Sequence, residues 1–370
     1  MIDTVRLAYD TKTIPKEFKF VQMKNGVFKG VINPTKIMKV SGKYYPRITC
    51  IKRPVGYGNY KCQILVEFSV PKLLMGNNFS EVCDTDFDAV VQILRHRLFE
   101  MGIKWQFSAC IKQYRVVKAD YSKNIIYEDG TSISQILRLL NSANIRRSLD
   151  VSAGDFRNGG QILHFHTGYR DIVFYDKIAD LKRSKISEKR CEEKDSFIQR
   201  SLFDLFEEKK QLSVLRFEIR LNGVKEIKSN LVKIGQDADD LSFERMFSSD
   251  ISRNILLYWW NEIFSRIPKA PLDNETIENV FLGLLNNPDA KPQKVLATLG
   301  VICLQRSHNY DARFIKELFD KRFCNGSWVR SNKALIVQKS PNNLQHLLYI
   351  EDAIKEMKPI NIDDYKDRIV

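Results

Sequence analysis

The chain has 370 residues, 44% of them apolar and 28% charged, so it can bury a hydrophobic core and is not an intrinsically disordered chain. Its 59 Lys and Arg residues outnumber 45 Asp and Glu residues, which gives a net charge of +14 at pH 7. Residues 246–370 hold 17 basic and 15 acidic residues, so the excess lies in the first 245, which hold 42 and 30. A basic surface attracts polyanions, and we expect nucleic acid as the partner; a basic protein that binds no polyanion is the alternative.

The cysteine pattern and the absence of apolar runs indicate the compartment. Seven cysteines are scattered along the chain without a Cys-x-x-Cys pair, which argues against a disulfide framework and a zinc ribbon. The start, Met1–Thr4, does not resemble a secretory signal, and no run approaches the roughly 18 apolar residues that a membrane helix needs. We therefore expect a cytoplasmic protein that has no membrane partner.

Strand and helix patterns alternate in the first part of the chain. The predicted elements are strands and turns over residues 1–70, a helix over 85–102, a strand over 110–120 and a helix over 132–142. The run Ile64–Val70 predicts a strand that ends at Pro71. Asp84 or Thr85 is the expected cap of the first helix, and Ser132 is the expected cap of the second.

Residues 161–176 predict a β-hairpin around the turn Thr167–Arg170. If the turn is centred on Gly168 and Tyr169, His164 lies opposite Val173 and Ile162 lies opposite Tyr175. Side chains alternate along a strand, so four of them share one face of the hairpin: His164, His166, Val173 and Tyr175.

A charged segment over residues 177–211, helical in its later half, leads to another strand, Ser213–Leu221. Alternation divides this strand into two faces. One face carries Val214, Arg216, Glu218 and Arg220, and the other carries Leu215, Phe217, Ile219 and Leu221.

Beyond residue 245 the patterns become helical, over residues 250–266, 275–285, 291–305 and 310–322. The last two, followed by residues 328–338 as a wing, resemble a winged helix-turn-helix unit. An all-helical cap on the first domain fits the same spacing equally well. We predict an α+β fold with two domains. Residues 1–245 form a mainly antiparallel sheet with helices on one face, and residues 246–370 form a mainly helical domain for DNA binding or interaction.

The hairpin carries the residues best suited to chemistry. Two imidazoles two positions apart on a strand, His164 and His166, can grip one divalent metal. A nearby tyrosine oxygen, that of Tyr175, can then attack a phosphate, with Lys177 as a point charge beside it. Each residue also has an ordinary explanation: Tyr175 as a strand aromatic and the histidines as partly buried side chains.

Four segments, taken in order, resemble the gene II/X replication initiators of filamentous phages and related plasmids. They are Pro71–Asn78, before the first long helix; Arg115–Asp120, a strand ending in an aspartate; Phe174–Asp180, a Tyr-x-Lys followed by an acid; and Leu215–Arg220, which contains Arg-Phe-Glu-x-Arg. The similarity covers residues 45–235 well and the C-terminal helices loosely. The ordered set is fairly specific, although no segment is decisive alone.

The resemblance implies an HUH-like nickase domain and a rolling-circle replication initiator. Tyr175 matches the family's nucleophile, which nicks one DNA strand, forms a 5′-phosphotyrosine link and later religates the strand. Asp120 and Glu218 match acidic positions suited to Mg²⁺ or Mn²⁺, and Lys177 and Asp180 match the residues after the tyrosine. The implied partners are single-stranded and double-stranded DNA at a replication origin, a host helicase and a host polymerase, in a bacterial cytoplasm.

The sequence departs from the family pattern at three places. Lys118 stands where an arginine is usual, and Asp180 stands where glutamate is more usual. The pair His164 and His166 is similar to the His-hydrophobe-His metal motif of the wider nicking-enzyme superfamily. There the pair usually lies much further from the tyrosine, which is carried on a helix, whereas nine positions separate His166 from Tyr175 here.

Five basic residues are candidates for contacts to DNA phosphates: Arg146, Arg147, Arg183, Lys185 and Arg190. Exposed basic residues are more often only solvated.

Two other functions fit the same sequence. The main rival to the nickase is a non-catalytic origin-binding protein or repressor of the same fold, which needs no metal; Asp120 and Glu218 would then be ordinary surface carboxylates. The other is a metal-dependent phosphodiesterase that acts on RNA without a covalent step.

Overall fold

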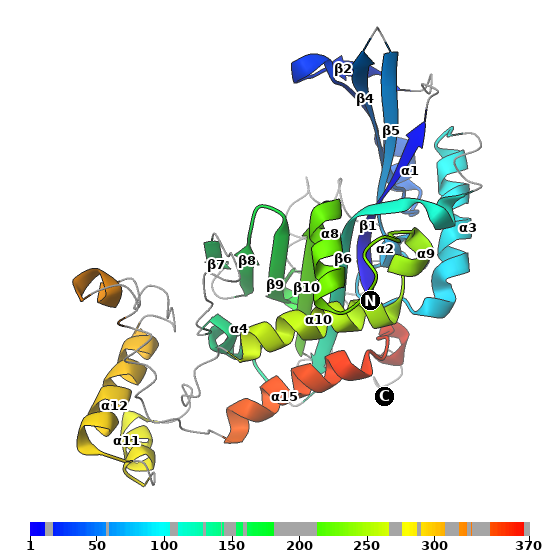
Figure 1. Cartoon of the computed structure of the whole chain (residues 1–370). Coiled ribbons are helices and arrows are strands. Elements are labelled where there is room, and N and C mark those ends of the chain that lie inside the picture. Colours follow the sequence, from blue (N-terminus) through cyan, green and yellow to red (C-terminus); the bar gives the residue numbers. More distant parts are fainter. Residues whose placement is uncertain are drawn as a thin grey trace.

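The sheet is the centre of the molecule, seen here in a computed structural model. The structure describes residues 1–11, 18–56, 59–103, 110–128, 131–141, 143, 153–157, 161–180, 213–265, 276–286, 290–307, 318–323, 327 and 341–365. Within these ranges ten strands form one sheet, in the order β2-β3-β4-β5-β1-β6-β10-β9-β8-β7 (Figure 1). Every neighbouring pair is antiparallel, which confirms the predicted α+β class with a mainly antiparallel sheet.

The strands are β1 Ile2–Thr11, β2 Phe20–Gln22, β3 Phe28–Ile32, β4 Arg47–Gly56, β5 Asn59–Ser69, β6 Arg115–Tyr127, β7 Ala153–Arg157, β8 Ile162–His166, β9 Arg170–Asp176 and β10 Ser213–Asn222. The α-helices are α1 Lys36–Val40, α2 Val70–Met75, α3 Phe87–Glu100, α4 Ile133–Asn141, α8 Val224–Lys233, α9 Phe243–Met246, α10 Ser249–Phe264, α11 Ile277–Leu285, α12 Pro292–Ser307 and α15 Pro341–Glu356. Short 3-10 helices are η1 Lys24–Gly26, η2 Asp84–Asp86, η4 Ile111–Gln113 and η6 Ile362–Tyr365.

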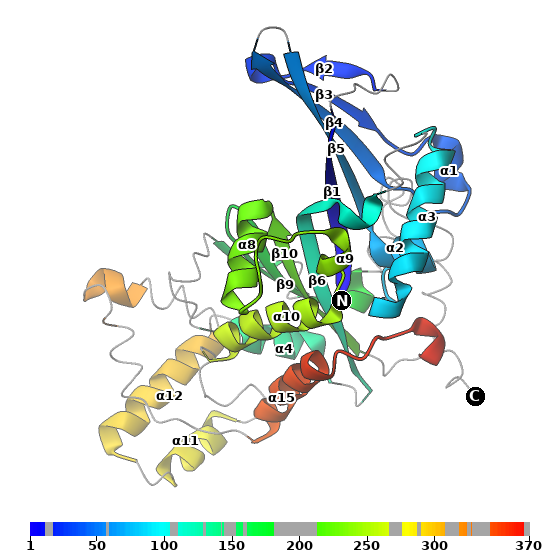
Figure 2. The same ribbon diagram turned by 45° about the vertical axis from the view of Figure 1, so that its right-hand side comes forward.

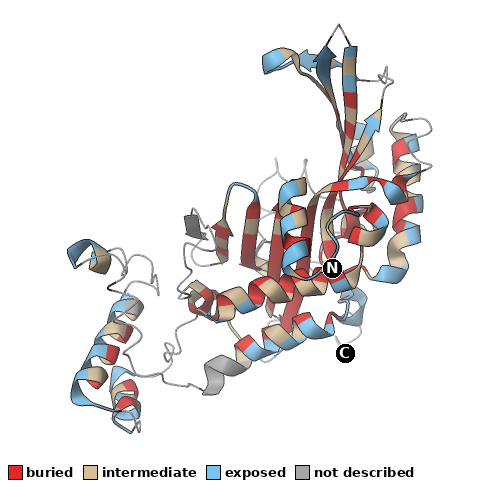
Figure 3. Cartoon of the chain, viewed as in Figure 1, coloured by how far each residue is buried: buried red, intermediate tan, exposed pale blue. Residues whose placement is uncertain are grey.

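The sheet has a face covered by helices, which we call the helix face. On this face Phe174 of β9 stacks on Phe217 of β10, with ring centroids 4.4 Å apart. Trp260 of α10 meets both rings at 6.4 Å, and Phe243 of α9 meets Phe68 of β5 at 5.9 Å. All five rings are essentially buried, so α9 and α10 are held to the sheet by aromatic packing, as Figure 3 shows by the red stripes along the strands.

The opposite side, which we call the polar face, carries the charged positions of the central strands. Cross-strand register places Arg6 of β1 beside Lys118 of β6, Asp120 of β6 beside Arg220 of β10, and Arg216 of β10 beside Tyr175 of β9. Period-two alternation therefore separates the apolar and charged residues of β10 in the way its sequence predicts.

The hydrophobic core crosses the expected domain boundary at residue 245. Trp260 of α10 and Ile350 and Ile354 of α15 belong to the same core as the sheet. By contrast, α11 and α12 pack around a small separate cluster that includes Val280 and Ile302. Figure 2 shows α11 and α12 at a distance from the sheet. The change to a helical pattern near residue 245 marks a change of secondary structure and does not mark the edge of the core.

Several element boundaries differ from the predictions. The strand expected over 110–120 begins at Arg115 and continues to Tyr127, because the Glu81 carboxylate pairs with the Lys123 ammonium and accepts a hydrogen bond from the backbone N–H of Asn124. The first long helix is preceded by a capping box of Cys83 and Asp86, in place of a cap by Asp84 or Thr85. Pro71 lies in the first turn of α2, where a missing N–H group costs nothing.

The C-terminal predictions are tested only in part. The helices expected over 250–266, 275–285 and 291–305 correspond to α10, α11 and α12. The helix at 310–322 is described only over its last residues, and the wing at 328–338 lies outside the described residues. Most of the charged segment 177–211 also lies outside them. No helix in the described ranges is both long enough and apolar enough to cross a membrane.

Candidate functional site

The hairpin around Thr167–Arg170 has the predicted register. Ile162 lies opposite Tyr175, His164 opposite Val173, and His166 opposite Asp171. The Thr167 side-chain oxygen accepts hydrogen bonds from the backbone N–H groups of Tyr169 and Arg170, which closes the turn. The register confirms that both histidines share the polar face with Tyr175.

Strand β10 joins this hairpin to strand β6, which carries Asp120. Its Arg216 lies directly opposite Tyr175, and its Glu218 lies opposite Val173, one row along. On its other side Arg220 lies opposite Asp120. Glu218 therefore lies between Tyr175 and Asp120 on three adjacent strands of the polar face, one row of side chains from each of them.

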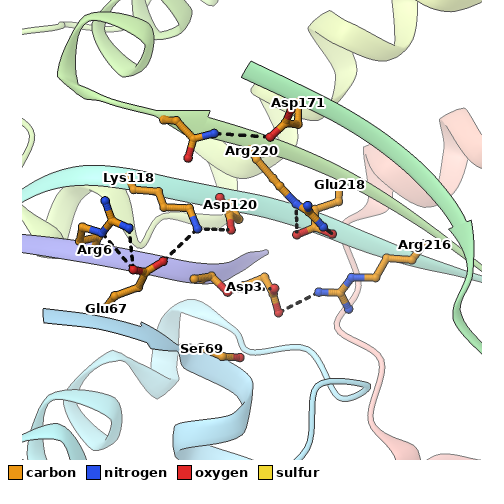
Figure 4. A network of polar contacts seen from close by, with 12 residues as sticks. Asp3, Arg6, Glu67, Ser69, Lys118, Asp120, Asp171, Arg216, Glu218 and Arg220 are labelled. Atoms are coloured by element: carbon orange, nitrogen blue, oxygen red, sulfur yellow. Dashed lines mark hydrogen bonds and ion pairs between the residues drawn. The ribbon is translucent and has the colours of Figure 1, made fainter. Parts of the chain in front are cut away.

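A row of alternating charges runs across the polar face, as Figure 4 shows. Arg6 and Lys118 both contact Glu67, at 2.6 Å and 3.1 Å, and Lys118 also contacts Asp120 at 3.2 Å. Further along, both Glu218 oxygens accept hydrogen bonds from Arg220. Arg216 closes the row with an ion pair to Asp3 at 2.8 Å and a hydrogen bond to the carbonyl of Asn78.

The two carboxylates that the sequence singled out have opposite electrostatic environments. Burial raises the pKa of Asp120, Lys118 opposes this rise, and the charge of Glu218 adds to it. For Glu218 burial again favours the neutral acid, but Arg220 and Arg216 outweigh burial and lower the pKa well below its usual value. At neutral pH Glu218 is therefore ionised, and Asp120 takes up a proton more readily than Glu218 does.

Tyr175 and Lys177 lie side by side at the end of β9. Tyr175 is 9% exposed, and Lys177 is fully buried with its ammonium nitrogen 5.7 Å from the centroid of the Tyr175 ring. Burial raises the pKa of Tyr175 well above 10, with Arg216 opposing, and burial lowers the pKa of Lys177 to about 7. The Lys177 nitrogen has no hydrogen-bond partner among the described residues, so a buried amine that is partly neutral at pH 7 lies beside a buried phenol.

Asp180 lies one helical turn beyond the tyrosine. The Asp176 side chain accepts a hydrogen bond from the N–H of Ala179 and so starts a turn over residues 177–180. Asp180 is half-buried, and its negative charge raises the pKa of both Tyr175 and Lys177. Asp180 thus contributes to the electrostatics of the site through its charge.

The histidines belong to a second group on the same face. His164 contacts Asp171 at 3.2 Å between Nε2 and Oδ1, and the rings of His164 and His166 are 5.2 Å apart. Two strands, β9 and β10, separate the histidines on β8 from Asp120 on β6. The structure therefore does not bring the four predicted metal ligands into one cluster.

The candidate ligands for a divalent metal are the two carboxylates, Asp120 and Glu218. No group of three or more His, Cys, Asp or Glu side chains among the described residues is arranged to hold a metal ion. The Oδ1 atom of Asp120 is nevertheless buried without a hydrogen-bond partner, and Glu218 raises the pKa of Asp120 by its charge. A cation between these two carboxylates would satisfy the orphaned oxygen and relieve their repulsion.

Some site residues were not singled out from the sequence. Asp171 is one, and the predicted register already placed it opposite His166. Arg216 and Arg220 were assigned to the correct strand face but were given no role, and alternation alone would have found them. Asp3 was missed because its contact with Arg216 joins distant parts of the chain. The five predicted phosphate contacts, Arg146, Arg147, Arg183, Lys185 and Arg190, lie outside the described residues.

Comparisons with known proteins add no relative, because no protein-family model, curated protein or solved structure matches the chain.

Proposed function

We propose that the protein is a rolling-circle replication initiator that nicks one strand of origin DNA with Tyr175. The observation that carries the proposal is the register of β6, β10 and β9, which groups Tyr175 with Arg216, Glu218 and Asp120 on one sheet face. The resemblance of the same segments to gene II/X initiators assigns the nucleophile to the same tyrosine. The excess of basic residues supports a polyanionic substrate.

The proposed reaction is an in-line displacement at phosphorus. The Tyr175 oxygen forms a bond to the phosphorus, the bond to the 3′ oxygen breaks, and that oxygen takes up a proton from water to become a 3′-OH. The proton of Tyr175 passes to the neutral amine of Lys177, whose pKa of about 7 makes it a usable base. Arg216, directly opposite the tyrosine, stabilises the phenolate and the phosphate oxygens.

Asp120 and Glu218 are the proposed ligands of Mg²⁺ or Mn²⁺. A divalent cation bound there would polarise a phosphate oxygen. For Glu218 to serve, Arg220 must release its two hydrogen bonds and become available to the DNA backbone. His164 and His166, tied to Asp171, are in this proposal a separate contact to the substrate strand and not metal ligands of the same ion.

The proposal also requires motion. Tyr175 is 9% exposed, so the residues that cover its hydroxyl must move aside when single-stranded DNA enters. This requirement separates recognition of the origin from cleavage, because only a strand that opens the site reaches the nucleophile.

In the test, the protein is incubated with Mn²⁺ or Mg²⁺ and labelled, overlapping single-stranded DNA fragments from the genetic element that encodes it. The products are separated on a denaturing gel. Wild type is expected to give a shifted covalent band that needs the metal, and Tyr175→Phe is expected to give none. Tyr169→Phe, on the exposed turn of the same hairpin, is the matched control and should keep the band. A band that survives in Tyr175→Phe would reject Tyr175 as the nucleophile.

A second candidate is a non-catalytic origin-binding protein or repressor. The observation that favours it is the extent of ion pairing: Glu67, Glu218 and Asp3 all have basic partners, as a purely structural charge row would. This candidate predicts tight binding to duplex origin DNA without any covalent band. It also predicts that Tyr175→Phe maintains the replicon in cells as well as wild type does.

A further inference from the structure

The net charge of the protein is concentrated in one segment. Residues 18–66 contain ten Lys and Arg residues and no Asp or Glu, and so account for +10 of the total of +14. They are Lys19, Lys24, Lys29, Lys36, Lys39, Lys43, Arg47, Lys52, Arg53 and Lys61. Most of this segment forms β2, β3, β4 and β5, whose outer parts project beyond the body of the molecule in both views (Figures 1 and 2). We call β2–β5 the arm.

One face of the arm is open and basic. Over residues 47–51 of β4 and 61–68 of β5 burial alternates, and Ile48, Cys50, Cys62, Ile64 and Val66 are buried on the helix face. The residues of the polar face are exposed or half-exposed and include Arg47, Arg53 and Lys61. Phe18 closes the helix face over Gly30, where a Cβ atom would lie 2.9 Å from that of Phe18. The polar face is therefore open along the length of β4, whereas the helix face is half-exposed only towards the tip, at Lys52 and Tyr60.

Most basic residues of this face are available for an anion. Lys61 is paired with Asp10 at 3.2 Å, but Arg53 has no ion pair within the described ranges and makes a long hydrogen bond, 3.5 Å, to the neutral Gln63. Arg47 and Lys29 form no ion pair with any described residue. The acids that border the face, Asp10 and Glu67, already have basic partners and leave a net positive surface.

The open face of the arm is continuous with the candidate site. One row of cross-strand neighbours runs from Arg47 to Glu67, from Glu67 to Arg6, and from Arg6 to Lys118. Lys118 contacts Asp120, so the row ends at the predicted metal ligand. A polyanion on the arm would therefore be guided along the same side of the sheet as Tyr175.

The chemistry of the face favours a duplex over a single strand. Binding of single-stranded DNA relies on exposed aromatic rings that stack on the bases. The arm's rings, Phe28 and Tyr60, lie on the opposite face, and Lys52 covers Tyr60 at 3.9 Å from the ring centroid. The open face instead offers point charges: Arg47 and Arg53 stand about 20 Å apart along β4 at 3.3 Å per residue, which matches about six base pairs of duplex. A ribbon of two or three strands is also close to the width of the major groove, about 12 Å.

We infer that the polar face of the arm, with Arg47 near one end of β4 and Arg53 towards the other, binds double-stranded DNA through its phosphates and presents the flanking duplex to the candidate site. The inference goes beyond nicking, because it holds whether or not Tyr175 is a nucleophile.

The test is a salt titration of duplex binding by the full chain. A fluorescent DNA duplex of about 30 base pairs, longer than the span of the arm, is titrated with wild type and with Arg47→Gln/Arg53→Gln. Loss of two phosphate contacts should weaken binding roughly ten- to a hundredfold near 100 mM salt and reduce the salt slope by about 2. The matched control, Lys225→Gln/Lys358→Gln, removes two exposed charges away from the arm and should change affinity less than threefold.

Three outcomes would overturn the inference: no duplex binding by wild type, equal weakening in the arm variant and the control, or tighter binding to anionic phospholipid vesicles or to single-stranded DNA than to duplex. Covalent-band formation on single-stranded DNA, measured in the same variants, separates this result from the proposed function. Failure of the nickase proposal leaves the titration unchanged, and failure of the arm leaves the covalent band unchanged.

Discussion

The most unusual single residue is Lys177, a fully buried amine without a hydrogen-bond partner in the part of the chain that the structure describes. Natural proteins rarely keep such a group unless it has a function, because burial of an unpaired ammonium group is costly. Its neighbours explain how it persists: Asp180, Asp3 and Glu218 supply negative charge, although burial and Arg216 still bring its pKa down to about 7.

Replacement of Lys177 by Met should stabilise the protein and abolish cleavage. Between pH 7 and 10.5 the unfolded chain holds a proton on Lys177 that the folded chain lacks, so wild-type stability rises with pH by about 1.4 kcal/mol per unit. Lys177→Met loses this dependence. Its advantage should be on the order of 4 kcal/mol near pH 7 and should shrink towards pH 10. Urea unfolding at several pH values measures it, and an advantage that does not change with pH would contradict the account.

The two carboxylates should respond differently to neutralisation. Glu218→Gln leaves Arg220 without its main counter-charge and should cost about 3 kcal/mol of unfolding free energy. Asp120→Asn removes a carboxylate with one unpaired oxygen and a raised pKa, and should cost about 1 kcal/mol or less. Urea unfolding at pH 7 compares them, and equal losses would show that the two environments do not differ as described.

At the scale of elements, α10 fixes the sheet that carries the site. Trp260 packs against Phe174 and Phe217, the helix-face neighbours of Tyr175 and Arg216 along β9 and β10. Next to it, the indole N–H of Trp259 donates to Asn230 of α8 at 2.7 Å. Helix α10 therefore supports β9 and β10 from the helix face of the sheet. Substitutions that loosen α10 should also disturb the residues of the polar face.

Trp260→Ala should destabilise the protein by about 3–5 kcal/mol because it leaves a cavity against two aromatic rings. Tyr258→Ala, on the half-buried side of the same helix, is the control and should cost clearly less. Denaturant unfolding of both variants gives the comparison. Equal losses of unfolding free energy in Trp260→Ala and Tyr258→Ala would show that the packing of Trp260 on the sheet does not hold the helix in place.

The sequence predicted the elements whose signals are local. The register of β8 and β9 followed from a four-residue turn, and the two faces of β10 followed from strict alternation. The second half of β6 was missed, because Tyr121–Asn124 contains a lysine and an asparagine that suggest a loop. Lys123 is neutralised by Glu81 at 2.6 Å, a partner on another segment that no local pattern reveals.

The sequence also predicted part of the candidate site. Tyr175 and Glu218 share one face because alternation along β9 and β10 places them there, whereas Lys177 lies just beyond the end of β9. Whether the histidines join Asp120 and Glu218 as metal ligands stays a prediction, and the structure places them on a different strand, because the order of strands in the sheet decides which residues meet. The sequence does not contain that order in any local form, and β9 and β10 separate β8 from β6.

At the scale of the molecule, the helices beyond residue 245 divide between two cores. Ile350 of α15 is buried in the main core, whereas Val280 of α11 is buried in the small cluster with α12. Both side chains are fully buried, so the same substitution can be compared in both places.

Ile350→Asp should lower the stability of the whole protein by several kcal/mol, because an unpaired charge enters the main core. Val280→Asp should instead release only α11 and α12 and leave the sheet intact. Hydrogen exchange followed by mass spectrometry locates the loss of protection. Loss of protection in the sheet strands of Val280→Asp would show that the two cores fold as one unit.

The central claim is that Tyr175 becomes covalently linked to DNA. The most direct measurement is mass spectrometry of the protein after incubation with the same single-stranded DNA fragments and Mn²⁺, nuclease trimming and proteolysis. We predict a nucleotide attached through a 5′-phosphate to the peptide that contains Tyr175, and to no other tyrosine peptide. A nucleotide on a different residue would move the nucleophile, and tight DNA binding without any adduct would contradict the nickase and leave the non-catalytic DNA-binding protein.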